Sequence, residues 1–354
     1  EYYETENALS HATHYSYDVQ GNVKTLWQED RHVRDLGGFI KRMDYDFGVV
    51  DGLVYRFDYQ PGEGDAYSHR YCYDANNRIQ EVWTSDGGGI WDRDQSSFYR
   101  YEGAQARMEV GEYRVQGMDY VYTLQGWIKG VNASSNLANR DLGNDGATSS
   151  GDPYNRLHRW SGRDAYAYTL YYNPTDYASI HNFSPGDRFY ADLPSNGGVF
   201  TEFSVPIMGM YNGNIAAMHT ALVGPNGSPQ EHLLKGYGYD QLMRLKEART
   251  KLADATTGSV LSTSNTWAGT GSESSDYYVG LDFDKNGNIE RLTRNGYAAG
   301  GLAMDNLTYE YQNENSYGAV FNKLNHVKDL VPGRPYGNAF GDQSAGNYTY
   351  DAIG

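Results

Sequence analysis

One stretch of the chain carries oxygen-bearing side chains at the spacing of a calcium-binding loop. Asp282, Asp284 and Asn286 alternate as the first ligands of such a loop do, and Gly287 stands where the loop turns sharply. The twelfth position, which should supply a bidentate glutamate, is Thr293 instead. The flanking residues follow a strand pattern rather than a helix pattern. We therefore expect a turn here and no calcium ion.

Other reactive residue types do not combine into a site. None of the nine histidines pairs with another at the i, i+4 spacing of a zinc-binding helix; His11 and His14 are close, but no cysteine or nearby histidine completes a tetrahedral set. The single cysteine, Cys72, is expected to fill a small apolar space. No nucleophile elbow or phosphate-binding loop is present. We expect no cofactor, no metal and no catalytic residue, so a glycosidase built on paired carboxylates is the least favoured hypothesis.

A tyrosine followed by an acidic residue recurs every 28 residues, which indicates a repeat architecture. The pattern occurs four times near the start of the chain, at Tyr17-Asp18, Tyr45-Asp46, Tyr73-Asp74 and Tyr101-Glu102. It returns later at Tyr239-Asp240, Phe283-Asp284, Tyr311 and Tyr350-Asp351.

Each repeat predicts a β-hairpin. Tyr-x-Tyr alternation places both rings on one face of a strand, and an apolar residue opens a return strand after the turn. Between them, an Asp bonds its own backbone, and Gly or Asn tolerates a positive φ, as at Gly21-Asn22 and Gly287-Asn288. A single hairpin is only marginally stable in water. Stability must therefore come from stacking many hairpins side by side.

These residues resemble the Rhs family, also called the YD-repeat family. Residues 122–132, 164–172 and 211–215 are similar to the form common in Bacteroidetes. The resemblance implies an all-β fold, in which a large spiralling antiparallel sheet of hairpins forms a hollow, cocoon-like shell around a C-terminal polypeptide that is often a toxin. The family's self-cleaving aspartyl segment has no counterpart here, so none of its catalytic residues is transferred to this chain.

The repeat pattern predicts three segments. Residues 1–132 are tandem YD-repeat hairpins, 133–200 form a loop-rich insertion within the repeat sheet, and 201–354 continue the repeats and stop within one. The insertion lacks apolar residues enough for a core of its own. Within 233–255 we expect a hairpin through Arg249, with a short helix after it as an alternative. Both ends of the chain look like cuts in a longer polypeptide.

Composition limits the partners. The chain has 29 basic and 45 acidic residues, a net charge of −16, so we expect no nucleic-acid partner. No run of about 18 apolar residues exists, so we expect no membrane span. The resemblance implies that the partners are the chain's own C-terminal toxin or cargo domain, the remaining repeats of the same polypeptide and a component of a secretion system. It also implies a bacterial protein that is secreted or held at the cell surface.

Two functions are compatible with these patterns. The first is a structural part of an Rhs-type shell, a container and not an enzyme. The alternative is a cell-surface adhesin, or a module that recognises a glycan or another partner through exposed rings such as Trp127 and Trp160.

Overall fold

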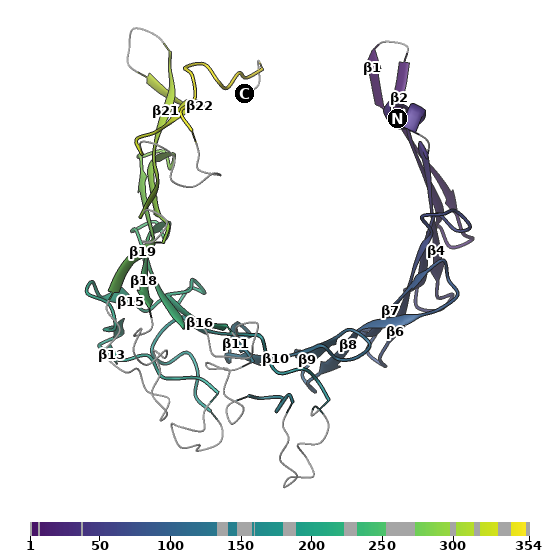
Figure 1. Cartoon of the computed structure of the whole chain (residues 1–354), viewed down its shortest axis with the longest axis horizontal. Helices are drawn as coiled ribbons and strands as arrows, with labels where there is room; N and C mark the ends of the chain where they lie inside the picture. Colours follow the sequence, from purple (N-terminus) through teal and green to yellow (C-terminus); the bar gives the residue numbers. More distant parts are fainter. Residues whose placement is uncertain are drawn as a thin grey trace. The chain divides into compact units, whose positions relative to one another are not determined.

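The chain folds into antiparallel β-hairpins. The computed structural model describes residues 2–5, 8–36, 38–132, 141–146, 158, 160–179, 189–222, 232–252, 273–297, 302–314, 319–331 and 341–351. The chain divides into two compact units, the first comprising residues 1–120 and 143–163, and the second comprising 121–142 and 164–354 (Figure 1).

Consecutive strands of the first unit pair with one another in chain order, each antiparallel to the next. The strands are β1 (Tyr2–Thr5), β2 (Ala8–Tyr17), β3 (Val23–Asp30), β4 (Ile40–Phe47), β5 (Val54–Tyr59), β6 (Tyr67–Tyr73), β7 (Ile79–Asp86), β8 (Asp92–Tyr99), β9 (Gln105–Val110) and β10 (Gln116–Tyr122). A short 3-10 helix, η1 (Arg31–Leu36), follows β3.

The second unit repeats this scheme and adds a small separate sheet. Its main strands, which also pair antiparallel along the series, are β11 (Ile128–Val131), β12 (Tyr166–Tyr171), β16 (Ala217–Leu222), β17 (Leu233–Tyr239), β18 (Leu245–Leu252), β19 (Glu273–Phe283), β20 (Ile289–Asn295), β21 (Ala303–Glu314) and β22 (Ala319–Asp329). The small sheet contains β13 (Ser195–Asn196), β14 (Val199–Phe200) and β15 (Ile207–Met208).

The predicted all-β fold of antiparallel hairpins is confirmed. The hairpin expected within 233–255 is present as β17 and β18, whereas the alternative helix after it falls outside the described residues. The closure of the sheet into a hollow shell and the limits of the three predicted segments stay predictions. In the part of the chain that the structure describes, no helix is long and apolar enough to cross a lipid bilayer.

The sheet of the first unit has two chemically different faces, because neighbouring residues of a strand point to opposite sides. Tyr45, Phe57 and His69 lie opposite one another on β4, β5 and β6, with ring centroids 5.2 and 6.0 Å apart along the row. Arg56 and Asp58, which flank Phe57, point to the other side and form an ion pair of 2.9 Å. We call these sides the aromatic face and the charged face.

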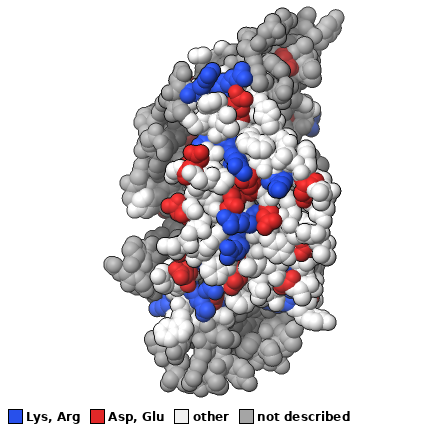
Figure 2. All heavy atoms as spheres, turned by 90° about the vertical axis from the view of Figure 1, so that its right-hand side faces the viewer, with Lys and Arg blue, Asp and Glu red and all other residues white. Residues whose placement is uncertain are grey.

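Acidic and basic side chains are interspersed on the surface of the first unit that Figure 2 shows. On the charged face, Arg42 pairs with Asp44 at 2.8 Å, and Arg70 lies over the Trp91 ring at 4.2 Å. Phe57 on the aromatic face and Arg56 and Asp58 on the charged face have intermediate exposure, and Arg42 and Arg70 are exposed. A sheet that is half-exposed on both sides buries little apolar area, so contacts between neighbouring hairpins must supply much of its stability.

The second unit does contain an apolar core. Phe200, Phe203 and Ile207 pack with Leu234 of β17 and Tyr171 of β12, and all five side chains are buried. Residues from the predicted insertion therefore share a core with the strands that follow it.

Removing a side chain from this core should destabilise the second unit. Leu234 is fully buried, so Leu234→Ala should lower the free energy of unfolding by about 2–5 kcal/mol through lost burial and a new cavity. Leu242→Ala is the matched control, because Leu242 is 70% exposed in the turn after β17. Urea unfolding followed by circular dichroism measures both. Equal losses for the two variants would contradict the described core.

Candidate functional site

The repeat aspartates form one recurring turn. In each of four hairpins, one carboxylate oxygen accepts hydrogen bonds from the backbone N–H groups two and four residues later, at 2.8–3.0 Å. The four are Asp18, Asp74, Asp240 and Asp284. The signature aspartate thus folds its own turn, as the sequence predicts.

A residue with positive φ occupies the same place in each of these turns, three positions after the aspartate. Gly21 and Gly287 have φ of 89° and 94°, and Asn77 and Met243 have φ of 62°. The geometry is a three-residue hairpin loop whose last residue is left-handed. The extra residue forms a β-bulge, so the pairing register of the two strands shifts next to the last aromatic residue. Gly and Asn favour this conformation, whereas Met243 adopts it at a conformational cost.

The residue four positions after the aspartate completes the turn and also contacts the next hairpin. Arg78 Nε donates to Asp74 at 2.7 Å, and Arg244 Nε donates to Asp240 at 2.6 Å. The Arg78 guanidinium lies 4.3 Å from the centroid of the Tyr99 ring in the following hairpin. Arg244 lies in the same way over Phe283, at 4.5 Å. In the other two turns, Asn22 and Asn288 donate to the aspartate instead.

The last tyrosine of a hairpin donates its hydroxyl hydrogen to a backbone carbonyl of an earlier hairpin. The acceptor belongs to the residue that opens the earlier return strand: Val54 for Tyr73, at 2.7 Å, and Ile289 for Tyr311, at 2.8 Å. Among the residues that the structure describes, six tyrosine hydroxyls donate to a carbonyl of an earlier hairpin in this way, at 2.7–3.0 Å. We call the donors the tyrosine ladder: Tyr73, Tyr99, Tyr172, Tyr239, Tyr311 and Tyr350.

Two of the predicted repeat pairs are not equivalent to the others. Tyr45 and Asp46 lie within β4, opposite Phe57 and Arg56, and the strand ends two residues later at Phe47. Tyr101 lies in the turn itself and is fully exposed, whereas the strand β8 ends at Tyr99.

The physical reason is that hairpins differ in length. The strand-ending aromatic residues Tyr17, Phe47, Tyr73 and Tyr99 follow one another at intervals of 30, 26 and 26 residues. Residues 28 positions apart in the sequence therefore do not always occupy equivalent places in their hairpins. The prediction that Tyr45 and Tyr101 occupy the same place in a hairpin as Tyr17 and Tyr73 is therefore wrong.

The final predicted pair continues the ladder. Tyr350 donates to the carbonyl of Leu324 at 3.0 Å, and the Lys323 ammonium lies 5.4 Å from its ring centroid. Asp351 is exposed, and residues 352–354, which would complete its turn, fall outside the described residues.

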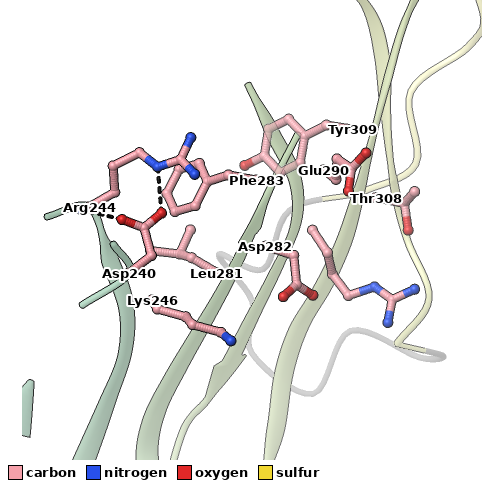
Figure 3. A pocket seen from close by; sticks show the side chains of 10 residues that line it. Asp240, Arg244, Lys246, Leu281, Asp282, Phe283, Glu290, Thr308 and Tyr309 are labelled. Carbon is pink, nitrogen blue, oxygen red and sulfur yellow. Dashed lines mark hydrogen bonds and ion pairs between the residues drawn. The ribbon is translucent and has the colours of Figure 1, made fainter. Parts of the chain in front are cut away.

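A groove of about 610 Å³ lies over β18 to β21 in the second unit. Its wall begins with the Asp240–Arg244 pair and the Phe283 ring, and Lys246 and Asp282 lie farther along it (Figure 3). The lining as a whole combines three acidic, three basic and two aromatic side chains: Asp240, Asp282, Glu290, Arg244, Lys246, Arg291, Phe283 and Tyr309. Such a lining suits many weak contacts with a chain of mixed composition.

A buried charge cluster holds part of the predicted insertion against the sheet of the first unit. Arg107 on β9 is 3% exposed and pairs with Asp119 of β10 and with Asp145. The Arg107–Asp145 distance is 2.6 Å, and Arg107 also donates to Ser161 at 3.1 Å. Glu109 follows on the same strand, 3.3 Å from Arg107.

Glu109 connects this cluster to a second cation and a histidine. Arg114 lies 3.2 Å from its carboxylate and the His158 Nδ1 atom 3.1 Å. Burial lowers the pKa of His158, although its hydrogen bond to Glu109 acts in the opposite direction. No sequence pattern identifies this cluster, because its members are up to 54 residues apart.

The two tryptophans considered for glycan recognition differ in exposure. Trp160 is 68% exposed. Trp127 packs on Tyr172, with ring centroids 5.0 Å apart, and so contributes to the second unit's own packing.

Comparison with known proteins gives weak structural likenesses. No protein-family model and no curated protein matches the chain. It is similar to the Photorhabdus luminescens Tc holotoxin pore with a mutated TccC3, at a TM-score of 0.37 and 11% identity, over 91% of this chain and 16% of that chain. It is also similar to the crystal structure of TcdB2-TccC3, at a TM-score of 0.25 and 10% identity, over 90% of this chain and 19% of that chain. The chain thus spans less than a fifth of either.

Removing one hydroxyl from the tyrosine ladder should weaken the first unit. Tyr73→Phe keeps the ring but leaves the Val54 carbonyl without this donor, so the free energy of unfolding should fall by about 0.5–1.5 kcal/mol. Tyr101→Phe removes a hydroxyl from an exposed ring and should change nothing measurable. Urea denaturation of both variants beside the wild type tests this, and an unchanged Tyr73→Phe midpoint would count against the ladder.

Acid should loosen the turns. Hydrogen bonding lowers the pKa of Asp74, chiefly from the Arg78 side chain, and that of Asp240, chiefly from the Arg244 backbone N–H. A lowered folded-state pKa means that the stabilisation is present above the unfolded value of about 3.9 and is lost as the pH falls through the folded value. At pH values below about 4, the urea concentration at the unfolding midpoint should therefore be lower than at neutral pH.

A matched pair of variants isolates this effect. Asp74→Asn removes the carboxylate and should be less stable at pH 7, with a smaller further loss on acidification. Asp86→Asn, which changes an exposed strand-end carboxylate, should keep the wild-type pH profile. An Asp74→Asn profile parallel to that of the wild type would contradict the assigned turn.

Proposed function

We propose that this chain is a structural wall segment of an Rhs-type shell that encloses a cargo segment of the same polypeptide. The observation that carries the proposal is the tyrosine ladder, in which six tyrosines of the described residues donate a hydroxyl hydrogen to an earlier hairpin. Such a link is local. A sheet held in this way can be extended by further hairpins without a central core, as a container wall requires.

The two faces of the sheet also support a wall. On the charged face, neighbouring ion pairs such as Arg56–Asp58 balance the charges, so this face can remain in contact with water. The aromatic face, with Tyr45, Phe57 and His69, offers ring surfaces to a loosely held chain. In the second unit, the groove beside Phe283 adds both signs of charge.

The role is therefore proposed to be mechanical and not catalytic. The partners would be a cargo or toxin domain, the remaining repeats of the polypeptide and a secretion-system component that delivers the protein outside the bacterial cell or to its surface. The acidic balance of the chain supports solubility of a large exposed sheet.

Protease protection in the full-length native polypeptide tests the enclosure. In the folded protein, peptides from segments outside the repeats should be released far more slowly than after unfolding in urea, as measured by mass spectrometry. Combining Tyr73→Phe, Tyr99→Phe and Tyr311→Phe should speed their release, because the wall then opens more often.

Tyr101→Phe serves as the control and should release cargo peptides at the wild-type rate. If the non-repeat segments of the folded protein are digested as fast as those of the unfolded protein, the chain does not enclose them. The adhesin alternative would then gain support.

A further inference from the structure

Two histidines and an aspartate converge at the start of the first unit. His11 lies on β2 directly opposite Asp30, the last residue of β3. His32 follows two residues later, in the first turn of η1. The backbone N–H of His32 donates to the Asp30 carboxylate at 3.0 Å. Strand pairing and the 3-10 turn thus bring together residues that are 21 positions apart, which the spacing of the histidines in the sequence does not reveal.

The three side chains present ligand atoms to a common point. The His11 Nε2 atom lies 3.3 Å from one carboxylate oxygen of Asp30, and the His32 Nδ1 atom lies 3.2 Å from the other. The two imidazole rings are 5.2 Å apart between centroids. One ligand atom of each residue lies within 4.8 Å of those of the other two.

These separations match the edges of a small coordination sphere. Zinc binds imidazole nitrogen and carboxylate oxygen at about 2.0–2.2 Å, so adjacent ligand atoms of a tetrahedral site are about 3.3 Å apart. A donor set of two imidazoles and one carboxylate binds first-row transition-metal ions in preference to calcium or magnesium. Protein zinc sites with three ligands leave a further position for water.

The local charges and exposure suit an ion that arrives from solvent. The side chains of His11, Asp30 and His32 are 46%, 41% and 48% exposed. Arg31, the nearest cation along the chain, is paired with Glu29 at 2.8 Å.

We propose that His11, Asp30 and His32 bind a divalent first-row transition-metal ion of the zinc class, with water in the remaining positions. The ion fastens η1 to the first described hairpin pair. Bound metal stabilises the folded state in proportion to the logarithm of its concentration over the dissociation constant. This site is independent of the enclosure proposed above.

Isothermal titration of the full chain with zinc chloride at pH 7.5 tests the proposal. The wild type should bind zinc at this site, and His11→Ala, His32→Ala and Asp30→Asn should each weaken binding about tenfold or more. His14→Ala is the matched control, because His14 is an exposed histidine on the same strand, outside the cluster.

A second readout does not depend on the variants folding. Zinc should protect His11 and His32, but not His14, from modification by diethyl pyrocarbonate in the wild-type chain. Unchanged zinc affinity in the cluster variants, no measurable binding, or equal protection of all three histidines would each overturn the site and leave only His–Asp ion pairs.

Discussion

The structure of the first unit depends on one constraint: a sheet that is half-exposed on both faces cannot be held by a buried core, so each hairpin must be fastened to its neighbours. Two kinds of bond meet this constraint, and at Tyr73-Asp74 and Tyr239-Asp240 they occur together. The signature aspartate folds the turn, and the strand-ending tyrosine joins the hairpin to an earlier one, as Asp74 and Tyr73 do. Where arginine follows, as at Arg78, a single guanidinium serves both purposes by bonding the aspartate and covering the next ring.

Segments outside the repeat pattern are held differently, by buried ionic contacts. Lys129 of β11 is 1% exposed, lies 4.3 Å from the Tyr171 ring centroid and bonds Asp176 at 2.9 Å. Asp176 in turn accepts from the Tyr172 backbone N–H, so one carboxylate positions a loop against two strands. Removing one partner of such a buried pair leaves an uncompensated charge and is strongly destabilising. Arg107 has the corresponding role in the first unit.

The sequence predicts the hairpins well because their signals are local: alternating rings, an Asp, and a Gly or Asn lie within seven residues. It places Tyr45 and Tyr101 incorrectly because strands and turns differ in length, so residues 28 positions apart need not occupy equivalent places in their hairpins. The hydrogen bond from Tyr73 to Val54 cannot be predicted from one repeat alone, because donor and acceptor belong to different hairpins. The Arg107 cluster and the His11–Asp30–His32 group cannot be predicted from the sequence either, because only the folded chain brings their members together.

Hydrogen exchange measured by mass spectrometry on a Tyr311→Phe variant tests the central claim most directly, namely that neighbouring hairpins hold one another through the tyrosine ladder. Tyr311 lies on β21 and bonds Ile289 at the start of β20. Locally linked hairpins predict faster exchange confined to β19–β22, with the first unit unchanged. Exchange that is unchanged everywhere, or raised uniformly across both units, would contradict the account.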